Sequence, residues 1–181
     1  MGIKIETERL TLREFVPEDA SVLISIAKQP HIEHWLPDWA GFHRWAVDWI
    51  NKARKNYKID NPQKEFIALA VDVKDKKQMI GQIGIGGHDN GIGVCYFMSD
   101  KFTGKGYTSE AMKAFIEYAF KKYGYDHLIA TVQPENAASN RVVQKLGFFY
   151  LSTIMMLDNG QTEELPFHFY RLDNPYVTLQ K

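Results

Sequence analysis

Residues 101–111 constrain this chain more than any other segment, because they place two glycines, Gly104 and Gly106, directly before the start of a helix. Residues 94–98 are apolar and have the pattern of a buried strand, and the residues after the glycines repeat apolar side chains with helical spacing. The glycines therefore belong to a strand-to-helix turn. In such a turn bare backbone can approach an anion, and the first helical amides supply donors at the positive end of the helix dipole. The segment predicts a pocket for phosphate oxygens.

The size and charge of the chain limit its partners. With 181 residues, 45% of them hydrophobic and 13% aromatic, we expect a single domain over residues 1–181. Twenty-two basic residues balance 22 acidic ones, so we expect no nucleic acid and no membrane as the main partner. An anion site must then be a local feature. The sequence leaves open whether the protein is a monomer or a homodimer.

Cysteine and histidine spacing argues against a disulfide and against a bound metal. Cys95 is the single cysteine, so no internal disulfide can form. No CxxC or HExxH pattern occurs, and His31 with His34 has no third partner nearby in the sequence, so we expect no metal site. No segment is long and apolar enough for a membrane span or a secretory signal, which makes the cytoplasm the expected location.

Hydrophobic periodicity predicts a mixture of helices and strands. Near-alternating apolar residues predict a strand around residues 10–15, and Pro17 then begins a short helix to about residue 28. Helical spacing of apolar residues predicts an amphipathic helix from Phe42 to Ala53. Further strands are predicted at residues 65–73, 78–88 and 91–98, which together indicate an antiparallel meander. After the glycine turn and its helix, we predict a strand at 127–132, a helix at 137–146 and strands at 148–157 and 165–172.

Three sequence pieces in this order resemble the GNAT superfamily of acetyl-CoA-dependent N-acetyltransferases. They are Glu-Thr-Glu-Arg-Leu-Thr-Leu-Arg at residues 6–13, Gly-Lys-Gly-Tyr at 104–107, and Asn-Ala-Ala-Ser at 136–139 running on to Lys-Leu-Gly-Phe at 145–148. The chain resembles most closely the ribosomal-protein N-terminal acetyltransferase-like branch. The resemblance implies an α/β fold with a mixed, mostly antiparallel sheet flanked by helices. It also implies two central parallel strands that splay apart and admit the pantetheine arm of the cofactor.

The resemblance assigns acetyl-CoA as cosubstrate and indicates where it is held. Gly104 and Gly106 let the diphosphate of the cofactor approach the backbone closely. The backbone amides around them are expected to point to the diphosphate, and they belong to Thr103, Lys105, Tyr107 and Thr108. Backbone near Met98 is expected to pair with the pantetheine amides, and Asn136 to contact the cofactor. The family usually has Gln or Arg where this chain has Lys101. The alternative reading is an ordinary tight turn at the glycines and a simple helix cap at Asn136.

Acetyl transfer to an amine needs a neutral nitrogen, stabilisation of an oxyanion and a proton for the departing thiolate. Many relatives carry a carboxylate on the strand before the phosphate turn, and residues 91–98 contain none. The general base is therefore unassigned, with candidates by residue type at His88, Asp89, His34 and Glu14. The tyrosine that many relatives use as thiolate acid is replaced by Val143. We assign Ser139 as donor to the thiolate; the alternative is an ordinary residue of the first helical turn.

The predicted function is acetyl transfer from acetyl-CoA to a primary amine by direct attack in a ternary complex. A protein N-terminal α-amine is slightly favoured over a small-molecule amine. Trp35 and Trp39 occupy a Pro-containing turn where the family's first helices overhang the acceptor cleft, so both are candidates for that cleft, with core packing as the alternative. A non-catalytic acyl-CoA-binding regulatory module remains a second hypothesis, because the tyrosine and carboxylate positions are vacant. A dinucleotide-binding fold would need repeated strand-helix-strand units, which the predicted meander contradicts.

Overall fold

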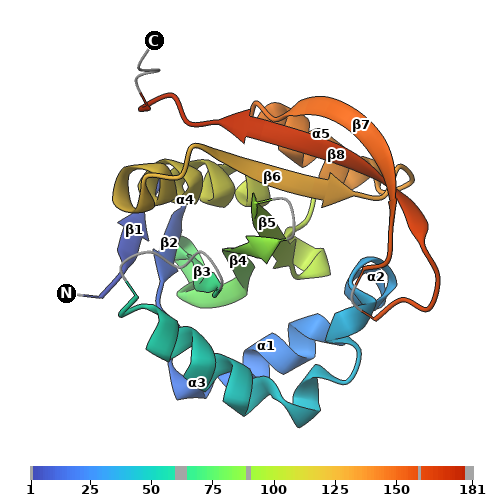
Figure 1. Cartoon of the computed structure of the whole chain (residues 1–181). Coiled ribbons are helices and arrows are strands. Elements are labelled where there is room, and N and C mark those ends of the chain that lie inside the picture. The colour runs from blue at the N-terminus through green and yellow to red at the C-terminus, as the bar shows by residue number, and fades with distance from the viewer. Residues whose placement is uncertain (1, 60–64, 89–90, 159, 178–181) are drawn as a thin grey trace.

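Eight strands form one sheet, with the spatial order β1-β2-β3-β4-β5-β6-β8-β7 (Figure 1). The computed structural model describes residues 2–59, 65–88, 91–158 and 160–177. The strands are β1 (Lys4–Glu6), β2 (Leu10–Arg13), β3 (Ile67–Val73), β4 (Gln78–His88), β5 (Gly91–Met98), β6 (His127–Val132), β7 (Phe149–Met156) and β8 (Leu165–Asp173). All neighbouring strands are antiparallel except the central pair β5 and β6.

The predicted strands are confirmed, including the antiparallel meander of β3, β4 and β5. The sequence analysis missed β1, which has only three residues and pairs with β2 through Lys4 to Glu6. A strand this short carries too little alternation to be recognised from its pattern. Asp89 and Asn90, which follow His88 in the sequence, lie outside the described residues.

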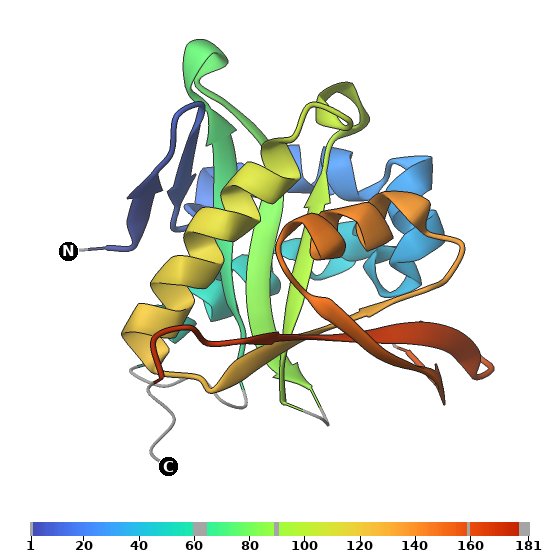
Figure 2. The same ribbon diagram turned by 90° about the horizontal axis from the view of Figure 1, so that it is seen from above.

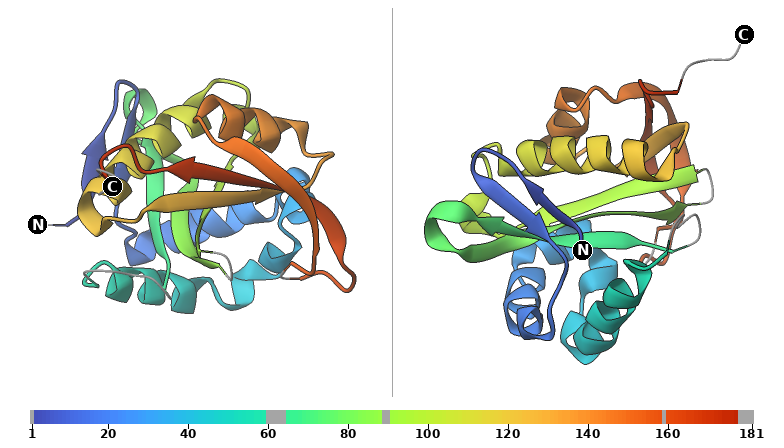
Figure 3. Two further views of the ribbon diagram at one scale, coloured as in Figure 1. Left: turned by 45° about the horizontal axis from the view of Figure 1, so that its top comes forward. Right: turned by 90° about the vertical axis from the view of Figure 1, so that its left-hand side faces the viewer.

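Helices cover both faces of the sheet (Figure 3). The α-helices are α1 (Ala20–Ala27), α2 (Pro30–Trp35), α3 (Ala46–Asn56), α4 (Tyr107–Tyr123) and α5 (Ala137–Lys145). One buried cluster packs α4 and Val143 of α5 against one face of the sheet. A second buried cluster packs the three helices α1, α2 and α3 against the opposite face, on β3, β4 and β5. Within the described residues no helix is long and apolar enough to cross a bilayer.

Two helix predictions differ from the structure. The predicted helix from Phe42 to Ala53 is interrupted, because Phe42–Arg44 forms a 3-10 turn and Trp45 leaves helical geometry with φ −132° before α3 begins. Helix α2 was not predicted; it has six residues and begins at Pro30, which suits a first helical position. Helix α2 lies beside the central strand β5, because the Nε2 of His31 is 3.1 Å from the carbonyl of Met98.

The two central strands diverge, as the family resemblance implied. β5 and β6 share a single registered pair, Gly93 with Ile129, and separate beyond it (Figure 2). The amide of Ser99 donates to the carbonyl of Ile80 on β4 (2.7 Å). Because backbone direction alternates along a strand, the polar groups of Met98 face away from β4, toward the opening. The divergence therefore leaves backbone donors and acceptors of β5 beside an open space.

Candidate active site

The glycine turn has the geometry of an anion-binding site. Gly104 (φ 71°) and Gly106 (φ 79°) are both left-handed, and Gly106 is the N-cap of α4 with no side chain capping the helix. Within the described part of the chain, the amides of residues 104–109 donate to no protein acceptor. A Cβ added at Gly104 would meet nothing within 4 Å, so the turn faces open space. Free amides at the positive end of a helix of 17 residues are suited to a diphosphate.

Arg9, in the turn between β1 and β2, fixes the glycine turn in place. Its Nη1 donates to the carbonyl of Lys105 (3.1 Å), and its guanidinium lies 4.5 Å from the ring centre of Tyr107. Glu110, in the first turn of α4, holds Arg9 through a 2.6 Å ion pair and also accepts from the hydroxyl of Thr7 (2.6 Å). These contacts lower the pKa of Glu110 against the opposing effect of desolvation, so its carboxylate stays ionised. The motif at residues 6–13 thus supports the turn.

A cleft of about 820 Å³ extends from the glycine turn through the gap between β5 and β6. We call it the central cleft. Its volume lies within the range of pockets that bind cofactors and small molecules. Its described lining includes residues of α2, β5, the glycine turn, β6, α5 and the segment after β7. Among the lining residues are His31, Trp35, Tyr96, Met98, Gly104, Gly106, Asn136, Ser139, Arg141, Lys145 and Asp158.

Most residues assigned to the site from sequence line this cleft. They are Met98, Thr103, Gly104, Gly106, Tyr107, Thr108, Asn136, Ser139 and Trp35. Asn136 is also the cap of α5, because its Oδ1 accepts from the amide of Ser139 (3.0 Å). The capping role predicted as an alternative is therefore real, and it leaves Asn136 beside the cleft.

Two of the assigned residues lie elsewhere. The side chain of Lys105 does not line the cleft, because its Nζ donates to the carbonyl of Lys101 (2.7 Å). The expectation for Trp39 is corrected: it is 6% exposed and packs in the core against Phe42 and Phe97, with ring centres 4.7 Å away in both cases. A large apolar ring removes more surface from water in that aromatic cluster than it would at the cleft.

The hydroxyl pair of Tyr96 and Ser139 stands at the opening between the strands. The two oxygens are 2.7 Å apart, although the residues come from β5 and α5. Burial raises the pKa of Tyr96 to about 12, so this hydroxyl keeps its proton at neutral pH. Val143, which replaces the usual tyrosine, is fully buried in the core. Tyr96 was not predicted as a site residue, because in the sequence it looks like any half-buried residue of an alternating strand.

A carboxylate near the opening was also missed. Asp158, just after β7, lines the central cleft. It lies close enough to Asp38 to raise the pKa of the Asp38 carboxyl through charge repulsion. Desolvation contributes more than this repulsion, and together they raise the pKa of Asp38 to about 6. The segment after β7 also packs closely against the backbone at Asp38, since a Cβ added to Gly160 would lie 2.5 Å from the amide nitrogen of Asp38. Asp38 and Asp158 form an acidic pair, of which Asp158 lines the cleft.

Three of the four general-base candidates named by residue type, His88, His34 and Glu14, are not among the described residues that line the central cleft. Glu14 accepts from the amide of Ile3 (2.8 Å), and exposed His34 packs edge-on against Trp35. His88 ends β4 and is not a lining residue, and Asp89 lies outside the described residues. The other lining carboxylate, Asp100, accepts from the amide of Lys101 (2.6 Å). Asp158 and Asp100 are thus the two carboxylates among the described residues that line the cleft, and Asp158 lies beside Asp38.

Further residues add to the chemistry of the cleft. The Nε2 of His31 lies 3.1 Å from the carbonyl of Met98, beside the backbone that faces the opening. Arg141 and Lys145 of α5 add two cations to the lining of the same cleft, and cations suit a negative phosphate. Cys95 does not line the cleft, and burial raises the pKa of its thiol to about 12, which excludes a thiolate nucleophile. No group of three or more His, Cys, Asp and Glu among the described residues could hold a metal.

These features fit acetyl-CoA. Unpaired amides and two cations suit its phosphates, and the backbone of Met98 suits an amide-bearing arm. The hydroxyl pair and Asp158 of the acidic pair line the same cleft. One cleft can therefore bind both the diphosphate and an amine.

Comparison with known proteins gives one family match, one similar sequence and two similar structures. A family model described as "Acetyltransferase (GNAT) domain" matches residues 9–149. The chain is similar to YnaD of Bacillus subtilis, an uncharacterised N-acetyltransferase, with 33% identity over 147 residues, 79% of this chain and 81% of YnaD. Its fold matches RimJ of Mycobacterium smegmatis, solved with CoA-disulfide (TM-score 0.81, 19% identity, 99% of this chain and 90% of RimJ). It also matches a ribosomal-protein-S5-alanine acetyltransferase of Vibrio fischeri (TM-score 0.74, 18% identity, 96% and 98%).

Proposed function

The chain belongs to the GNAT family of acetyltransferases and is an acetyl-CoA-dependent N-acetyltransferase; from that premise we propose that its acceptor is a protein N-terminal α-amine. We further propose that the amine attacks directly in a ternary complex. The observation that carries the proposal is the single cleft joining the free amides of the glycine turn to the acidic pair. Both substrates can occupy it together, so no covalent enzyme intermediate is needed.

The acceptor preference follows from the cost of deprotonation. An α-amine with pKa about 7.7 to 8.0 is roughly a tenth to a fifth neutral at pH 7. A lysine amine with pKa about 10.4 is neutral roughly once in 2,500 molecules, which costs about 4.6 kcal/mol. One lining carboxylate at Asp158, backed by Asp38, is a modest base and suits the cheaper substrate. The neighbour from Vibrio fischeri acts, by its name, on an alanine of ribosomal protein S5, which supports the same choice.

Residues of this chain are placed for cofactor binding, for deprotonation of the amine and for protonation of the thiolate. Bound acetyl-CoA supplies the acetyl thioester. The amides of Tyr107 and Thr108 hold the phosphates, and the backbone of Met98 orients the arm. Asp158, with Asp38 beside it, takes a proton from the substrate ammonium, and the neutral amine then attacks the thioester carbonyl. The Tyr96 and Ser139 hydroxyls donate toward the departing thiolate, which needs only a hydrogen bond because a thiol has a pKa near 8.5.

A thiol-release assay with a panel of amines tests the proposal. We expect free CoA to appear with peptides that have a free N-terminus. The same peptides with an acetylated N-terminus and an internal lysine, and small polyamines, should give little or none. Preference for a polyamine would overturn the acceptor assignment. Binding of acetyl-CoA without thiol release for any amine would favour the regulatory module instead, although Tyr96 and Asp158 now offer the groups whose absence suggested that module.

Removing the hydroxyl pair should slow turnover more than it weakens cofactor binding. We expect Ser139→Ala and Tyr96→Phe each to lower kcat about tenfold, because each leaves the thiolate with one hydroxyl fewer, at a cost of roughly 1.4 kcal/mol. The double variant should lose less than the product of the two effects, since the hydroxyls act as one hydrogen-bonded unit. Steady-state kinetics and calorimetry with acetyl-CoA measure both quantities. Wild-type rates in both single variants would remove the pair from the mechanism.

Trp35 should affect the acceptor rather than the cofactor. It lines the cleft from α2, so we expect Trp35→Ala to raise the acceptor KM about tenfold and leave the KM for acetyl-CoA unchanged. Trp39→Ala is the matched control, because Trp39 is buried in the core and should lower the melting temperature instead. A Trp35 variant with altered acetyl-CoA binding and normal acceptor KM would show that α2 borders the cofactor.

The acidic pair should give a pH dependence of stability with an unusual sign. The pKa of Asp38 is about 6 in the folded protein against an ordinary 3.8, so the folded chain keeps a proton that the unfolded chain has released. The free energy of unfolding should therefore fall as pH rises from about 4 to 6. Asp38→Asn should remove this fall and be more stable than wild type at pH 7 by about 1 kcal/mol, allowing for solvent screening. Denaturant melts at pH 4 and pH 7 measure it; identical pH profiles would contradict the buried charge.

A further inference from the structure

The ring of Trp35 lines the central cleft without being part of the hydrophobic core. Trp35 is half-buried on α2, and within the described residues it belongs to neither buried cluster. Its ring lies edge-on to that of exposed His34, with ring centres 4.3 Å apart. The other three tryptophans all have ring contacts with Phe42 and belong to, or pack against, the cluster beneath α1, α2 and α3. A large apolar ring that borders a cleft and is not held in the core is available to a ligand.

Phe167 of β8 is a second aromatic ring of this kind. It lines the central cleft, and within the described residues neither buried cluster includes it. Phe167 is opposite Ile154 of β7 in the register of the sheet, and the last registered pair of the two strands is Met156 with Leu165. Asp158 follows Met156 by two residues and also lines the cleft. Phe167 and Asp158 therefore both lie near the same end of the β7 and β8 pair.

Helix α2 adds an apolar border beside Asp158. Ile32 and Trp35 are three residues apart on the helix, Leu36 follows at its end, and all three line the central cleft. Asp38 comes two residues after Leu36, and Asp158 lies close enough to Asp38 to raise the pKa of its carboxyl. Asp158 is thus a carboxylate of the cleft that lies next to the apolar end of α2.

We propose that the acceptor has a large apolar side chain next to its α-amine, such as that of leucine, methionine or phenylalanine. The inference rests on the proposed function and specifies the first residue of the acceptor peptide. The ammonium group pairs with Asp158, and the side chain contacts an apolar subsite formed by Ile32, Trp35, Leu36 and Phe167. The methyl group of an alanine would leave much of this apolar surface in contact with water, whereas a larger side chain removes it from water.

The acidic pair disfavours two other classes of acceptor. A first residue with an acidic side chain would bring a second negative charge to Asp158, which already lies close to Asp38. A free amino acid would do the same with its α-carboxylate, where a peptide has a neutral amide. Like charges repel more strongly in a partly desolvated cleft than in water. The cleft is therefore suited to a peptide with a neutral, apolar first residue, and less to a free amino acid.

Thiol release with peptides that differ only in their first residue tests the inference. We expect kcat/KM for peptides that begin with leucine, methionine or phenylalanine to exceed that for alanine or serine peptides about tenfold or more. The aspartate peptide and free leucine should give the lowest values. A kcat/KM for the alanine peptide that equals or exceeds that for the leucine peptide overturns the inference and leaves the α-amine acceptor in place. Thiol release from none of the peptides overturns the proposed acceptor itself, and this inference with it.

Variants of the apolar subsite test whether these residues produce the preference. The readout is the ratio of kcat/KM for the leucine peptide to that for the alanine peptide, because a general loss of active enzyme leaves this ratio unchanged. We expect Trp35→Ala to lower the ratio about tenfold and Phe167→Leu about threefold. Leucine is a conservative choice at Phe167, which is buried, so the fold should be kept. A wild-type ratio in both variants overturns the inference.

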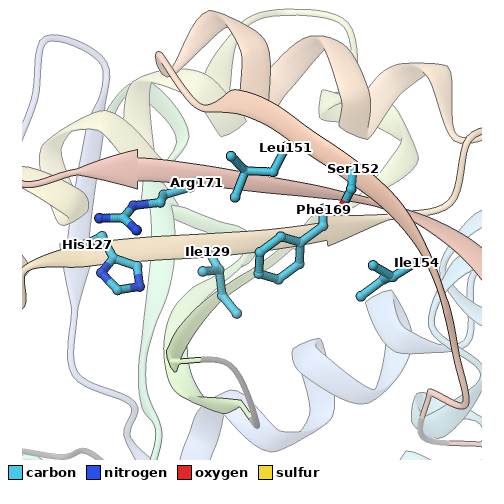
Figure 4. A pocket seen from close by; sticks show the side chains of 7 residues that line it. All are labelled: His127, Ile129, Leu151, Ser152, Ile154, Phe169 and Arg171. Atoms are coloured by element: carbon cyan, nitrogen blue, oxygen red, sulfur yellow. The ribbon is translucent and has the colours of Figure 1, made fainter.

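Phe169→Ala is the matched control for these variants. Phe169 lies two residues beyond Phe167 on β8 and lines a separate open cavity of about 320 Å³, with Ile129 and Ile154 among its other lining residues (Figure 4). Its ring is removed from the same strand but not from the central cleft, so the wild-type ratio should remain. A ratio that falls as far in Phe169→Ala as in Phe167→Leu would show a general effect of β8 and overturn the role of Phe167.

Discussion

Replacing Gly104 by valine should raise the dissociation constant for acetyl-CoA at least tenfold while the protein remains folded. Gly104 has a φ of 71°, and a Cβ there would project into open space beside free amides. The valine side chain would occupy the volume that phosphate oxygens need, so at least roughly 1.4 kcal/mol of binding energy should be lost. Titration calorimetry with acetyl-CoA measures the change.

The same α4 helix offers a matched control for the backbone cost. Gly124 is its C-cap, with a φ of 67° and nothing within 4 Å of an added Cβ. Valine at either glycine should destabilise the fold by a similar amount, about 1–2 kcal/mol, because both positions are left-handed. Only Gly104→Val should lose affinity. If both variants bind acetyl-CoA as wild type does, the turn does not hold the diphosphate. Gly106 is a less clean site for this test, because its Cβ would lie 3.5 Å from the Nη2 of Arg9.

Asp158→Asn should lower kcat about a hundredfold at pH 7 with little change in acetyl-CoA affinity. A positioned general base contributes typically 10²–10⁴ in rate, and the low end applies to an α-amine that is already partly neutral. The loss should shrink toward pH 9, because the substrate amine, with pKa about 7.7 to 8.0, then needs no base. Thiol release measured from pH 6 to pH 9 gives both results.

Asp100→Asn controls for the removal of a lining carboxylate. Asp100 lines the cleft but accepts from the amide of Lys101, so its loss should leave the pH profile of kcat unchanged. An Asp158 variant whose deficit is the same at every pH would act through position or charge and not as a base. That result would leave the acetyltransferase assignment intact and remove the general base from the proposed mechanism.

The parts of the site that could be predicted from sequence depend on local physical chemistry. Gly104 and Gly106 were recognised because a pair of glycines, a preceding apolar strand and helical periodicity follow one another directly in the sequence. Asn136 was assigned through the motif of the family resemblance, and its predicted role as a helix cap is a contact over three residues. Strand bounds at β4, β5 and β6 were predicted closely for the same reason.

The missed residues depend on contacts between distant segments. Tyr96 reaches Ser139 only because β5 and β6 separate and α5 packs across the opening. Asp158 meets Asp38 only because the segment after β7 returns to the turn after α2. Neither pairing leaves a periodic trace, since a hydroxyl or carboxylate on a strand or loop looks like any solvent-exposed polar residue. Trp39 shows the opposite error, because it was predicted to border the cleft and is buried in the core. Its turn resembles a cleft border in sequence, but the aromatic cluster around it belongs to the core.

By itself the sequence determined the phosphate turn, the order of the elements and, through three motifs, the family, because each rests on short-range backbone preferences. Tertiary structure alone decided which hydroxyl and which carboxylate stand at the opening and which tryptophan borders it. Those outcomes depend on how the sheet diverges and on which helices cover it. Packing over long sequence separations sets them, and a local pattern carries no record of such packing.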